Sequence, residues 1–455
     1  MIIKNTISFR DDSARVVKIE QKFCRYIFFN YKNEYDHLMI SGLYDELVTK
    51  ELLIDHKEID FDPYDNEIYK LILPFQIPFQ SYPFEWSYIH WKKAILAYLK
   101  INLIALKYGM ILKDATPYNF FQKGGKAILF DTTSFIFFKK NDSWIAYRQF
   151  CQEFLAPIAL IYFRSPEWSR LTMSHLRGMD LRFVSKHLPF KSYFNLTIFL
   201  NIHLQSKFTN NNFKKKNINK GFVVENLIFL HNIIYKSISN WKNQTFYFSE
   251  WYDYYEKNIE SQNYINKKVS FLKEVLVEYK PISVLDLGAN SGIFSFISSE
   301  YSKKVIAVES DYGCIDLMEK RIEDSGNHNI FTLYAKITEF SNGLGLQGKE
   351  IQKLSERIVS DLVLVLALVH HLYINCFLSF AQIVDELFNL SNRFVLIEFV
   401  PQEDPKVIWL MQSKNRKLID YNEIEFETAF RLKFKLLKKE IIHDSLRIIY
   451  FFEKI

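Results

Sequence analysis

A glycine-punctuated loop carries the first residues whose types and spacing can do chemistry. The segment from Ile282 to Ser295 places Asp286, Gly288 and Gly292 between a short apolar run and the predicted start of a helix. Glycines permit positive φ and close backbone approach, and a loop between a strand and a helix directs backbone N–H groups at one small space. The segment therefore predicts a binding loop for a polar or anionic ligand.

A second acid follows at the end of the next apolar run, which spans Val305 to Glu309, 23 residues beyond Asp286. In a doubly wound sheet, an acid at this place accepts hydrogen bonds from ribose hydroxyls. A dinucleotide favours G-x-G-x-x-G, whereas this loop reads D-x-G-x-x-x-G. The combination resembles motif I and the acidic loop of class I S-adenosylmethionine (SAM)-dependent methyltransferases. A dinucleotide enzyme and an ordinary strand–helix turn without a ligand are the alternatives.

The resemblance implies SAM as the cofactor and assigns roles to individual residues. It implies that Asp286 orients the methionine amino group through the loop, Glu309 binds the ribose hydroxyls and Asn290 lines the pocket. The predicted cofactor-binding residues are therefore Asp286, Gly288, Asn290, Gly292 and Glu309, and no metal site is predicted.

Two adjacent histidines are candidates for general-base chemistry. His370 and His371 follow the predicted strand 359–366, at the edge of the sheet where open α/β domains bind ligands. A histidine there can take a proton from an acceptor O–H or N–H, and methyl transfer otherwise needs mainly positioning and desolvation. The alternative is a framework role, in which one histidine packs against the strand 394–399.

Two further features bear on the choice of ligand. Glu398, Glu403 and Asp404 lie at or just after the end of the fifth predicted strand and suit a cationic or hydroxylated acceptor, although a solvated rim loop is the favoured interpretation. Lys336 stands where such enzymes commonly carry an acid that accepts a hydrogen bond from the adenine amino group, and a lysine cannot accept one. The sequence therefore predicts that Glu339 or the backbone substitutes, or that SAM binds weakly.

A second constellation lies around residues 87–160. Asp114 and Asn119 follow a predicted helix, and Asp131 follows a predicted hairpin. This order resembles the catalytic core of the protein-kinase-like fold, which implies Mg²⁺-nucleotide binding by these three residues. However, no G-x-G-x-x-G loop or V-A-I-K strand precedes it, and Asp131-Thr-Thr-Ser replaces Asp-Phe-Gly. These departures favour a degenerate scaffold or a small-molecule pocket over an active kinase, and simple turn-capping by Asp114 and Asn119 is the alternative.

The elements that position the first site alternate between strand and helix, which predicts a doubly wound, Rossmann-like α/β domain over residues 263–455. A helix is predicted over 263–279. A terminal antiparallel hairpin resembles the class I methyltransferase sheet and differs from a dinucleotide-binding fold. The predicted strands are 282–287, 304–309, 329–334, 359–366, 394–399, 433–441 and 446–452.

Residues 1–262 are predicted to form an α+β, kinase-like domain. Gly124-Gly125 is predicted to form a two-residue hairpin turn, and Gly109 is predicted to end a helix. The lysine-rich segment 205–221 is predicted to be an exposed loop with a solvated surface. The predicted strands are 14–19, 24–29 and 68–73; the predicted helical segments are 35–53, 87–108, 144–200 and 251–255.

Composition excludes several classes of function. A net charge of +6 is small for 455 residues, so nucleic-acid binding is not expected. The four cysteines form no C-x-x-C pair and fit a reducing compartment. The chain lacks a signal-peptide-like start and any apolar run of the roughly 18 residues needed to span a bilayer. The expectation is a cytoplasmic protein without a membrane span.

Six segments together resemble a family of bacterial SAM-dependent methyltransferase-like proteins that includes a rhizobial nodulation-specificity protein. The resemblance implies methylation of a small molecule or saccharide, without defining the acceptor atom or the oligomeric state. A non-catalytic binding protein and a bifunctional kinase–methyltransferase are the alternatives. The segments are Tyr82–Trp86, Leu112–Asn119, Ala146–Phe150, Asp286–Gly292, Leu366–Leu372 and Ile397–Pro401.

Overall fold

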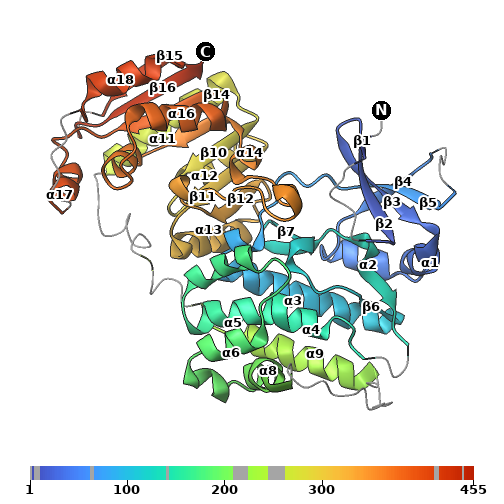
Figure 1. Cartoon of the computed structure of the whole chain (residues 1–455). Coiled ribbons are helices and arrows are strands. Elements are labelled where there is room, and N and C mark those ends of the chain that lie inside the picture. Colours follow the sequence, from blue (N-terminus) through green and yellow to red (C-terminus); the bar gives the residue numbers. More distant parts are fainter. Residues whose placement is uncertain are drawn as a thin grey trace. The chain divides into compact units, whose positions relative to one another are not determined.

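The computed structural model of the chain forms two compact units, residues 1–245 and 246–455 (Figure 1). It describes residues 3–4, 11–61, 66–139, 143–208, 224–243, 249, 262–413, 420–442 and 445–455. The domain boundary predicted after residue 262 adjoins residues 250–261, which lie outside the described part, and it stays a prediction. The predicted helical segment 251–255 lies there too.

An antiparallel sheet opens the first unit, with the strand order β1-β2-β3-β5-β4. The three strands predicted from sequence are β2, β3 and β5. The helix predicted over 35–53 is instead two helices, because Gly42 lies between them with φ = 88°, a conformation that ends a helix. The strands are β1 (Ile3–Lys4), β2 (Ala14–Ile19), β3 (Lys22–Phe28), β4 (His56–Ile59) and β5 (Ile68–Pro74).

Helices form most of the rest of the first unit. The predicted helix 87–108 is α3 (Tyr88–Ala105) with one further 3-10 turn, and it ends at Gly109, which has φ = 71°. Gly124 and Gly125 both have positive φ and close the predicted hairpin of β7 (Phe120–Lys123) and β8 (Lys126–Leu129). A second small pair joins β6 (Met110–Leu112) to β9 (Phe135–Phe137).

The region predicted as helical over 144–200 is helical with several breaks. Its first long helix has a π-helical part, and 3-10 turns separate the later helices. The predicted loop 205–221 is corrected at its start, where residues 205–208 are helical; the rest lies outside the described residues. The other helices of this unit are α1 (Lys32–Ile40), α2 (Leu43–Thr49), α4 (Tyr147–Gln149), η6 (Phe150–Leu155), α5 (Ala156–Phe163), η7 (Pro166–Ser174), α6 (Leu181–His187), η8 (Phe190–Phe194), α7 (Leu196–Ile198), η9 (Phe199–Leu204), α8 (Gln205–Phe208) and α9 (Val224–Ser239).

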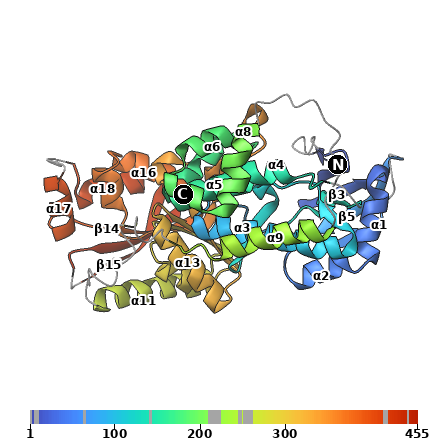
Figure 2. The same cartoon turned by 90° about the horizontal axis from the view of Figure 1, so that it is seen from below.

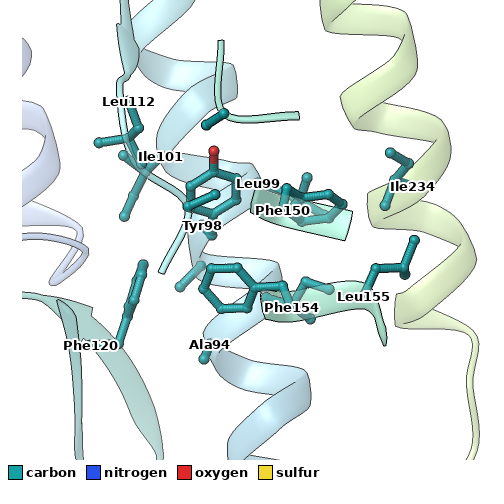
Figure 3. Close-up of a cluster of buried hydrophobic side chains, with 14 of the residues drawn as sticks. Ala94, Tyr98, Leu99, Ile101, Leu112, Phe120, Phe150, Phe154, Leu155 and Ile234 are labelled. Atoms are coloured by element: carbon teal, nitrogen blue, oxygen red, sulfur yellow. The ribbon is translucent and has the colours of Figure 1, made fainter. Parts of the chain in front are cut away.

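Aromatic side chains fill the core of the first unit (Figure 3). The Tyr98 ring on α3 lies 5.5 Å from that of Phe150 and 5.2 Å from that of Phe154. Phe120 of β7 meets Phe154 edge-on, so the hairpin is anchored on the same cluster. Burial of such rings is the largest stabilising contribution available to this unit.

The second unit is a seven-stranded sheet with the order β12-β11-β10-β13-β14-β16-β15. The first five strands in this order pair in parallel, and the last two pair antiparallel, which confirms the predicted terminal hairpin. The buried central strands are continuous apolar runs, as expected when helices cover both faces of a sheet. The strands are β10 (Ser283–Leu287), β11 (Lys304–Glu309), β12 (Ile330–Tyr334), β13 (Ser360–Val365), β14 (Ser391–Phe399), β15 (Phe434–Ile441) and β16 (Ile448–Lys454).

The helices of the second unit alternate with its parallel strands. The helix predicted over 263–279 is α11 (Gln262–Tyr279). Within the described ranges, neither unit contains a helix long and apolar enough to cross a membrane. The remaining helices are α12 (Ile293–Ser299), α13 (Tyr312–Ser325), α14 (Leu354–Arg357), α15 (Val369–Ile374), α16 (Phe380–Leu390), α17 (Pro405–Ser413) and α18 (Glu423–Arg431).

Replacing Phe150 with alanine should destabilise the first unit by about 3–5 kcal/mol, because a fully buried ring would leave a cavity among packed neighbours. Denaturant unfolding followed by tryptophan fluorescence measures the change, since Trp144 lies 5.0 Å from this ring. Phe29→Ala, at a side chain that is 52% exposed, is the control and should cost much less. Equal losses in the two variants would contradict the proposed core.

Candidate cofactor site

The predicted binding loop follows β10 directly and has the strained backbone that its glycines permit. Gly288, Asn290 and Gly292 all have positive φ, at 72°, 50° and 84°. A Cβ on Gly292 would lie 2.8 Å from the side chain of Met318 on α13, so only glycine lets the loop pack this closely. The predicted tight loop is therefore present, and both the positive φ and the contact with Met318 require glycine at position 292.

Glu309 holds this loop to the end of the neighbouring strand. Its carboxylate accepts the backbone N–H of Asn290 at 2.7 Å and, through the other oxygen, those of Ser310 at 2.6 Å and Asp311 at 3.0 Å. The side chain is 6% exposed, and its burial raises the pKa against the lowering effect of these N–H donors. The structure thus brings together two of the predicted residues, Glu309 and Asn290, through a direct hydrogen bond.

Asp286 is a buried carboxylate with one hydroxyl partner. The Ser295 hydroxyl on α12 donates to it at 2.6 Å, and Asp286 makes no ion pair with any residue of the described ranges. Burial raises its pKa to about 6, and the more distant Lys268 offsets this only in part. An ionised, buried acid without an ion-pair partner favours a cationic ligand group.

Two tyrosines beside Glu309 were missed by the sequence reasoning. Tyr312 begins α13 and Tyr334 ends β12, where it is in register with Glu309. Their rings stack 3.9 Å apart with an angle of 4° and are almost fully buried. The sequence did contain a signal for Tyr334: an aromatic residue at the end of the predicted strand next to the one that ends in Glu309.

Lys336 lies two residues beyond this tyrosine stack. Its side chain is 48% exposed, and its ammonium lies 3.7 Å from the carboxylate of Glu339. Lys336 and Glu339 therefore pair with each other near the end of β12, and the predicted substitution of Glu339 for the missing acid stays a prediction.

The two histidines lie in the first turn of α15 and their rings are 4.2 Å apart. Burial lowers the pKa of His370 far below its usual range and that of His371 to about 4. Both imidazoles are therefore neutral at neutral pH. Nδ1 of His370 is buried and has no hydrogen-bond partner among the described residues. A neutral imidazole has one ring nitrogen that accepts a hydrogen bond and one that donates.

Glu398, which was predicted on a solvated rim, is fully buried at the end of β14. The Lys268 ammonium lies 2.8 Å from its carboxylate, and the Tyr264 hydroxyl donates to the other oxygen. Burial opposes ionisation of Glu398, but Lys268 and Arg447 outweigh it and lower the pKa. The rim prediction is also wrong for Asp404, which is buried against the guanidinium of Arg447 at 2.8 Å.

This buried network also holds the turn between β13 and α15. Glu398 accepts the backbone N–H of Ala367 at 2.7 Å, and Ala367 has φ = 52°, a costly conformation for a residue with a Cβ. The next residue, Leu368, comes within 3.5 Å of the position that a Cβ on Gly288 would take. Glu398 therefore positions the turn that lies between the binding loop and the two histidines.

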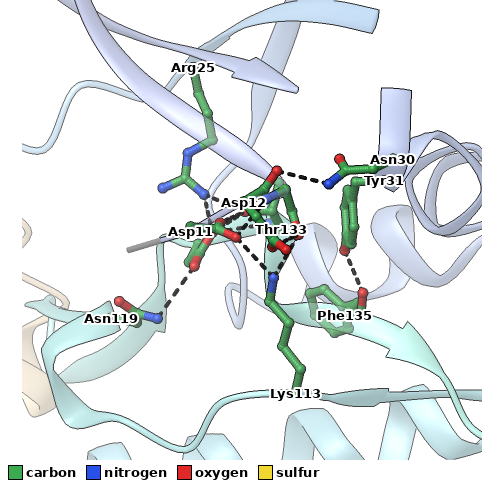
Figure 4. Close-up of polar contacts among 11 residues, drawn as sticks. Asp11, Asp12, Arg25, Asn30, Tyr31, Lys113, Asn119, Thr133 and Phe135 are labelled. Carbon is green, nitrogen blue, oxygen red and sulfur yellow. Dashed lines mark hydrogen bonds and ion pairs between the residues drawn. The ribbon is translucent and has the colours of Figure 1, made fainter. Parts of the chain in front are cut away.

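The second constellation is also assembled, but around cations from the protein (Figure 4). Asn119 donates to Asp131 at 3.4 Å, as the predicted grouping requires. The guanidinium of Arg25 on β3 forms an ion pair with Asp131, and it outweighs the effect of burial to lower the pKa of Asp131. Burial, with Asp131 contributing, raises the pKa of Asp114. No cluster of three or more metal-ligating side chains occurs in the described ranges.

Comparisons with known proteins give one sequence match over nearly the whole chain and several structural matches at low identity. No family model matches the chain. Nodulation protein NoeA of Rhizobium meliloti (strain 1021) is 27% identical over 465 aligned positions, which cover 98% of this chain and 95% of that protein. The N-methyltransferase NodS of Bradyrhizobium japonicum matches 43% of this chain and 99% of its own, with 11% identity and a TM-score of 0.32. Magnesium protoporphyrin IX methyltransferase (ChlM) of Synechocystis PCC 6803 matches 42% of this chain and 84% of its own, with 13% identity and a TM-score of 0.32.

Replacing Asp286 with asparagine should stabilise the second unit more at neutral than at acidic pH. Its folded-state pKa of about 6 exceeds the usual 3.8, so the wild-type carboxylate costs stability increasingly as pH rises between these values. The gain should be about 2 kcal/mol larger at about pH 7.5 than at about pH 4.5. Urea unfolding of both proteins at the two pH values measures it. Asp324→Asn, at an exposed acid, should show no such difference, and a pH-independent gain in Asp286→Asn would refute the raised pKa.

Replacing Lys268 with methionine should destabilise the second unit by about 3–5 kcal/mol, because Glu398 would lose its closest cation while staying buried. The double variant Lys268→Met/Glu398→Gln should recover part of this loss. A double-mutant cycle built from unfolding free energies measures the coupling, expected at about 1–3 kcal/mol. Strict additivity of the two single changes would show that the ion pair does not operate.

Proposed function

We propose that the chain is a SAM-dependent methyltransferase whose cofactor binds to the loop after β10. The observation that carries this proposal is the buried Asp286, which has no ion-pair partner in the described structure and lies at the base of a loop that Glu309 holds in place. A cofactor that presents an ammonium group and vicinal hydroxyls matches these two acids. The strand order, with its antiparallel terminal hairpin, supports the same proposal.

The chemistry of the loop residues fits the parts of such a cofactor. Asp286 is proposed to orient the methionine ammonium, and Glu309 to accept a hydrogen bond from the ribose through Oε2, which accepts only the Asn290 N–H among the described residues. Gly288 and Gly292 permit close approach of the backbone, and Asn290 is proposed to line the pocket. When bound, SAM supplies an activated methyl group on a sulfonium sulfur.

His370 and His371 are proposed to act on the acceptor. Their neutral imidazoles can accept a hydrogen bond from an acceptor O–H or N–H and orient its lone pair. The low pKa of each makes it a weak base, so a proton would transfer only as the acceptor atom becomes acidic during methylation. This role suits positioning and desolvation better than full deprotonation beforehand.

The acceptor is proposed to be a small molecule or a saccharide, and a cytoplasmic location is proposed for the enzyme. The N-terminal unit is proposed to be a degenerate kinase-like scaffold that contributes to acceptor binding. Its antiparallel sheet, the hairpin and the Asn119–Asp131 contact support this assignment. The Arg25 guanidinium forms an ion pair with the Asp131 carboxylate, so a metal ion would first have to displace the guanidinium. This ion pair favours a scaffold over a kinase.

Calorimetric titration of SAM and S-adenosylhomocysteine into the full chain tests the proposal. Glu309→Ala should weaken binding by about 1.5–3 kcal/mol, the value of a hydrogen bond to a charged group. Affinity for SAM should also fall about tenfold for each pH unit below about 6, because protonated Asp286 no longer attracts the ammonium.

Glu300→Ala is the matched control, because this acid lies on the exposed end of α12 in the same unit. Its affinity should equal that of the wild-type protein. A folded wild-type protein that binds neither ligand at millimolar concentration would refute the cofactor site. Equal weakening by Glu300→Ala and Glu309→Ala would refute the role given to Glu309.

A further inference from the structure

Three aromatic rings at the surface of the N-terminal unit lie next to one another. Phe190 and Phe194 of η8 are 76% and 80% exposed, and Tyr193 between them is 41% exposed. The ring centroid of Phe190 lies 5.9 Å from that of Tyr193 and 5.5 Å from that of Phe194. Large exposed apolar side chains that gather in one place mark interaction sites, whereas single ones are common.

A second row of apolar side chains continues from these rings. Leu196, Leu200 and Phe208 repeat at multiples of four along the unbroken helical run α7–η9–α8 and are 62%, 41% and 51% exposed. Ile198 and Ile202, on the other side of the run, are fully buried. The run therefore has apolar side chains on both sides. One side packs on the core, whereas the other exposes leucine and phenylalanine, which a surface helix ordinarily replaces with polar residues.

Ring contacts join the two rows. Tyr193 stacks on His203 of η9 at 3.7 Å and lies 6.4 Å from Phe199. Figures 1 and 2 both show the green helices α6 and α8 side by side, in agreement with the packing of α6 on this run. We call the six exposed side chains the apolar patch: Phe190, Tyr193, Phe194, Leu196, Leu200 and Phe208.

The charged residues within the elements that carry or adjoin the apolar patch are basic. Lys186, Lys191 and Lys207 are exposed on the same short elements, and the exposed Arg182 pairs with Asp180. From residue 181 to residue 224 the sequence contains no aspartate or glutamate, although acids are common elsewhere in the chain. The three exposed lysines therefore lie on elements without an acidic residue, and this arrangement favours an anionic partner.

We propose that the apolar patch and its lysines dock the protein on the surface of an anionic phospholipid bilayer. Phenylalanine and leucine side chains insert at the boundary between headgroups and acyl chains, while lysines bind the anionic headgroups. Nucleic acid would use the cations but leave the apolar side chains without a role. The proposed docking is interfacial, because it uses side chains at the surface of short helices.

Flotation of the full chain with vesicles tests this proposal. The protein should float with vesicles of phosphatidylcholine and phosphatidylglycerol, bind vesicles of phosphatidylcholine alone at least tenfold more weakly, and dissociate as salt is raised. Phe190→Ser/Phe194→Ser should reduce the binding constant for these vesicles, obtained by varying the lipid concentration, at least tenfold. Lys186→Glu/Lys191→Glu should reduce it at least 25-fold, since each lysine near the surface contributes roughly a factor of five to the binding constant.

Matched controls separate the patch from general surface effects. Phe377→Ser, at a ring that is 68% exposed in the second unit, and Lys57→Glu, on the exposed strand β4, should bind like the wild-type protein. Circular dichroism and SAM titration should be unchanged in all variants, so a failure of the cofactor site would not be mistaken for a failure of docking.

Two results would overturn the proposal. One is equal binding by the patch variants and the controls. The other is a wild-type protein that self-associates in gel filtration and ignores vesicles while Phe190→Ser/Phe194→Ser is monomeric, which would assign the patch to a second copy of the chain.

Discussion

Desolvation of acidic side chains at the carboxyl edge of the parallel sheet is the constraint on which the second unit depends. Asp286, Glu309 and Glu398 end or follow strands β10, β11 and β14, and none is more than 6% exposed. A carboxylate in such surroundings is costly unless donors or cations compensate it. The structure compensates each acid differently. Three backbone N–H groups bind Glu309, two cations and a tyrosine bind Glu398, and, among the described residues, only the hydroxyl and backbone N–H of Ser295 bind Asp286.

These differences separate the acids that the protein itself compensates from the acid that we propose binds a ligand. Glu398 is fully compensated by the protein, so its pKa is lowered and its function is to hold the turn at Ala367. Asp286 is compensated less, so burial raises its pKa, as the proposed binding of a cationic group there requires. Asp131 in the N-terminal unit follows the pattern of Glu398, because Arg25 already supplies its cation. A buried acid that the protein compensates poorly lowers the free energy of unfolding, and such an acid is a candidate for binding a cationic ligand group.

Much of the second unit follows from the sequence because its signals are local. Continuous apolar runs give the parallel strands, and D-x-G-x-x-x-G gives the loop, since positive φ at two positions requires glycine. Asn290 adopts positive φ without being glycine, which one sequence cannot reveal. The burial of Glu398 was missed because its partners Lys268 and Arg447 lie far away along the chain. Long-range ion pairs leave no periodic pattern to detect.

The first unit shows the same division between local and tertiary information. The turn at Gly124-Gly125 and the helix end at Gly109 were predicted, because both depend on a few adjacent residues. The prediction of one helix over 35–53 is wrong at Gly42, whose positive φ separates α1 from α2. The low pKa of the two histidines depends on burial and on distant cations, which sequence order does not contain.

The contact between Gly292 and Met318 links the cofactor loop to the helix behind it. A Cβ on Gly292 would overlap both the Cγ and the sulfur of Met318, and Met318 is fully buried. A side chain at position 292 would require a smaller residue at position 318, and a branched residue at 318 would press on the loop. The two positions are therefore sterically coupled. The packing of α13 in the hydrophobic core limits which residue the loop after β10 can accept at position 292.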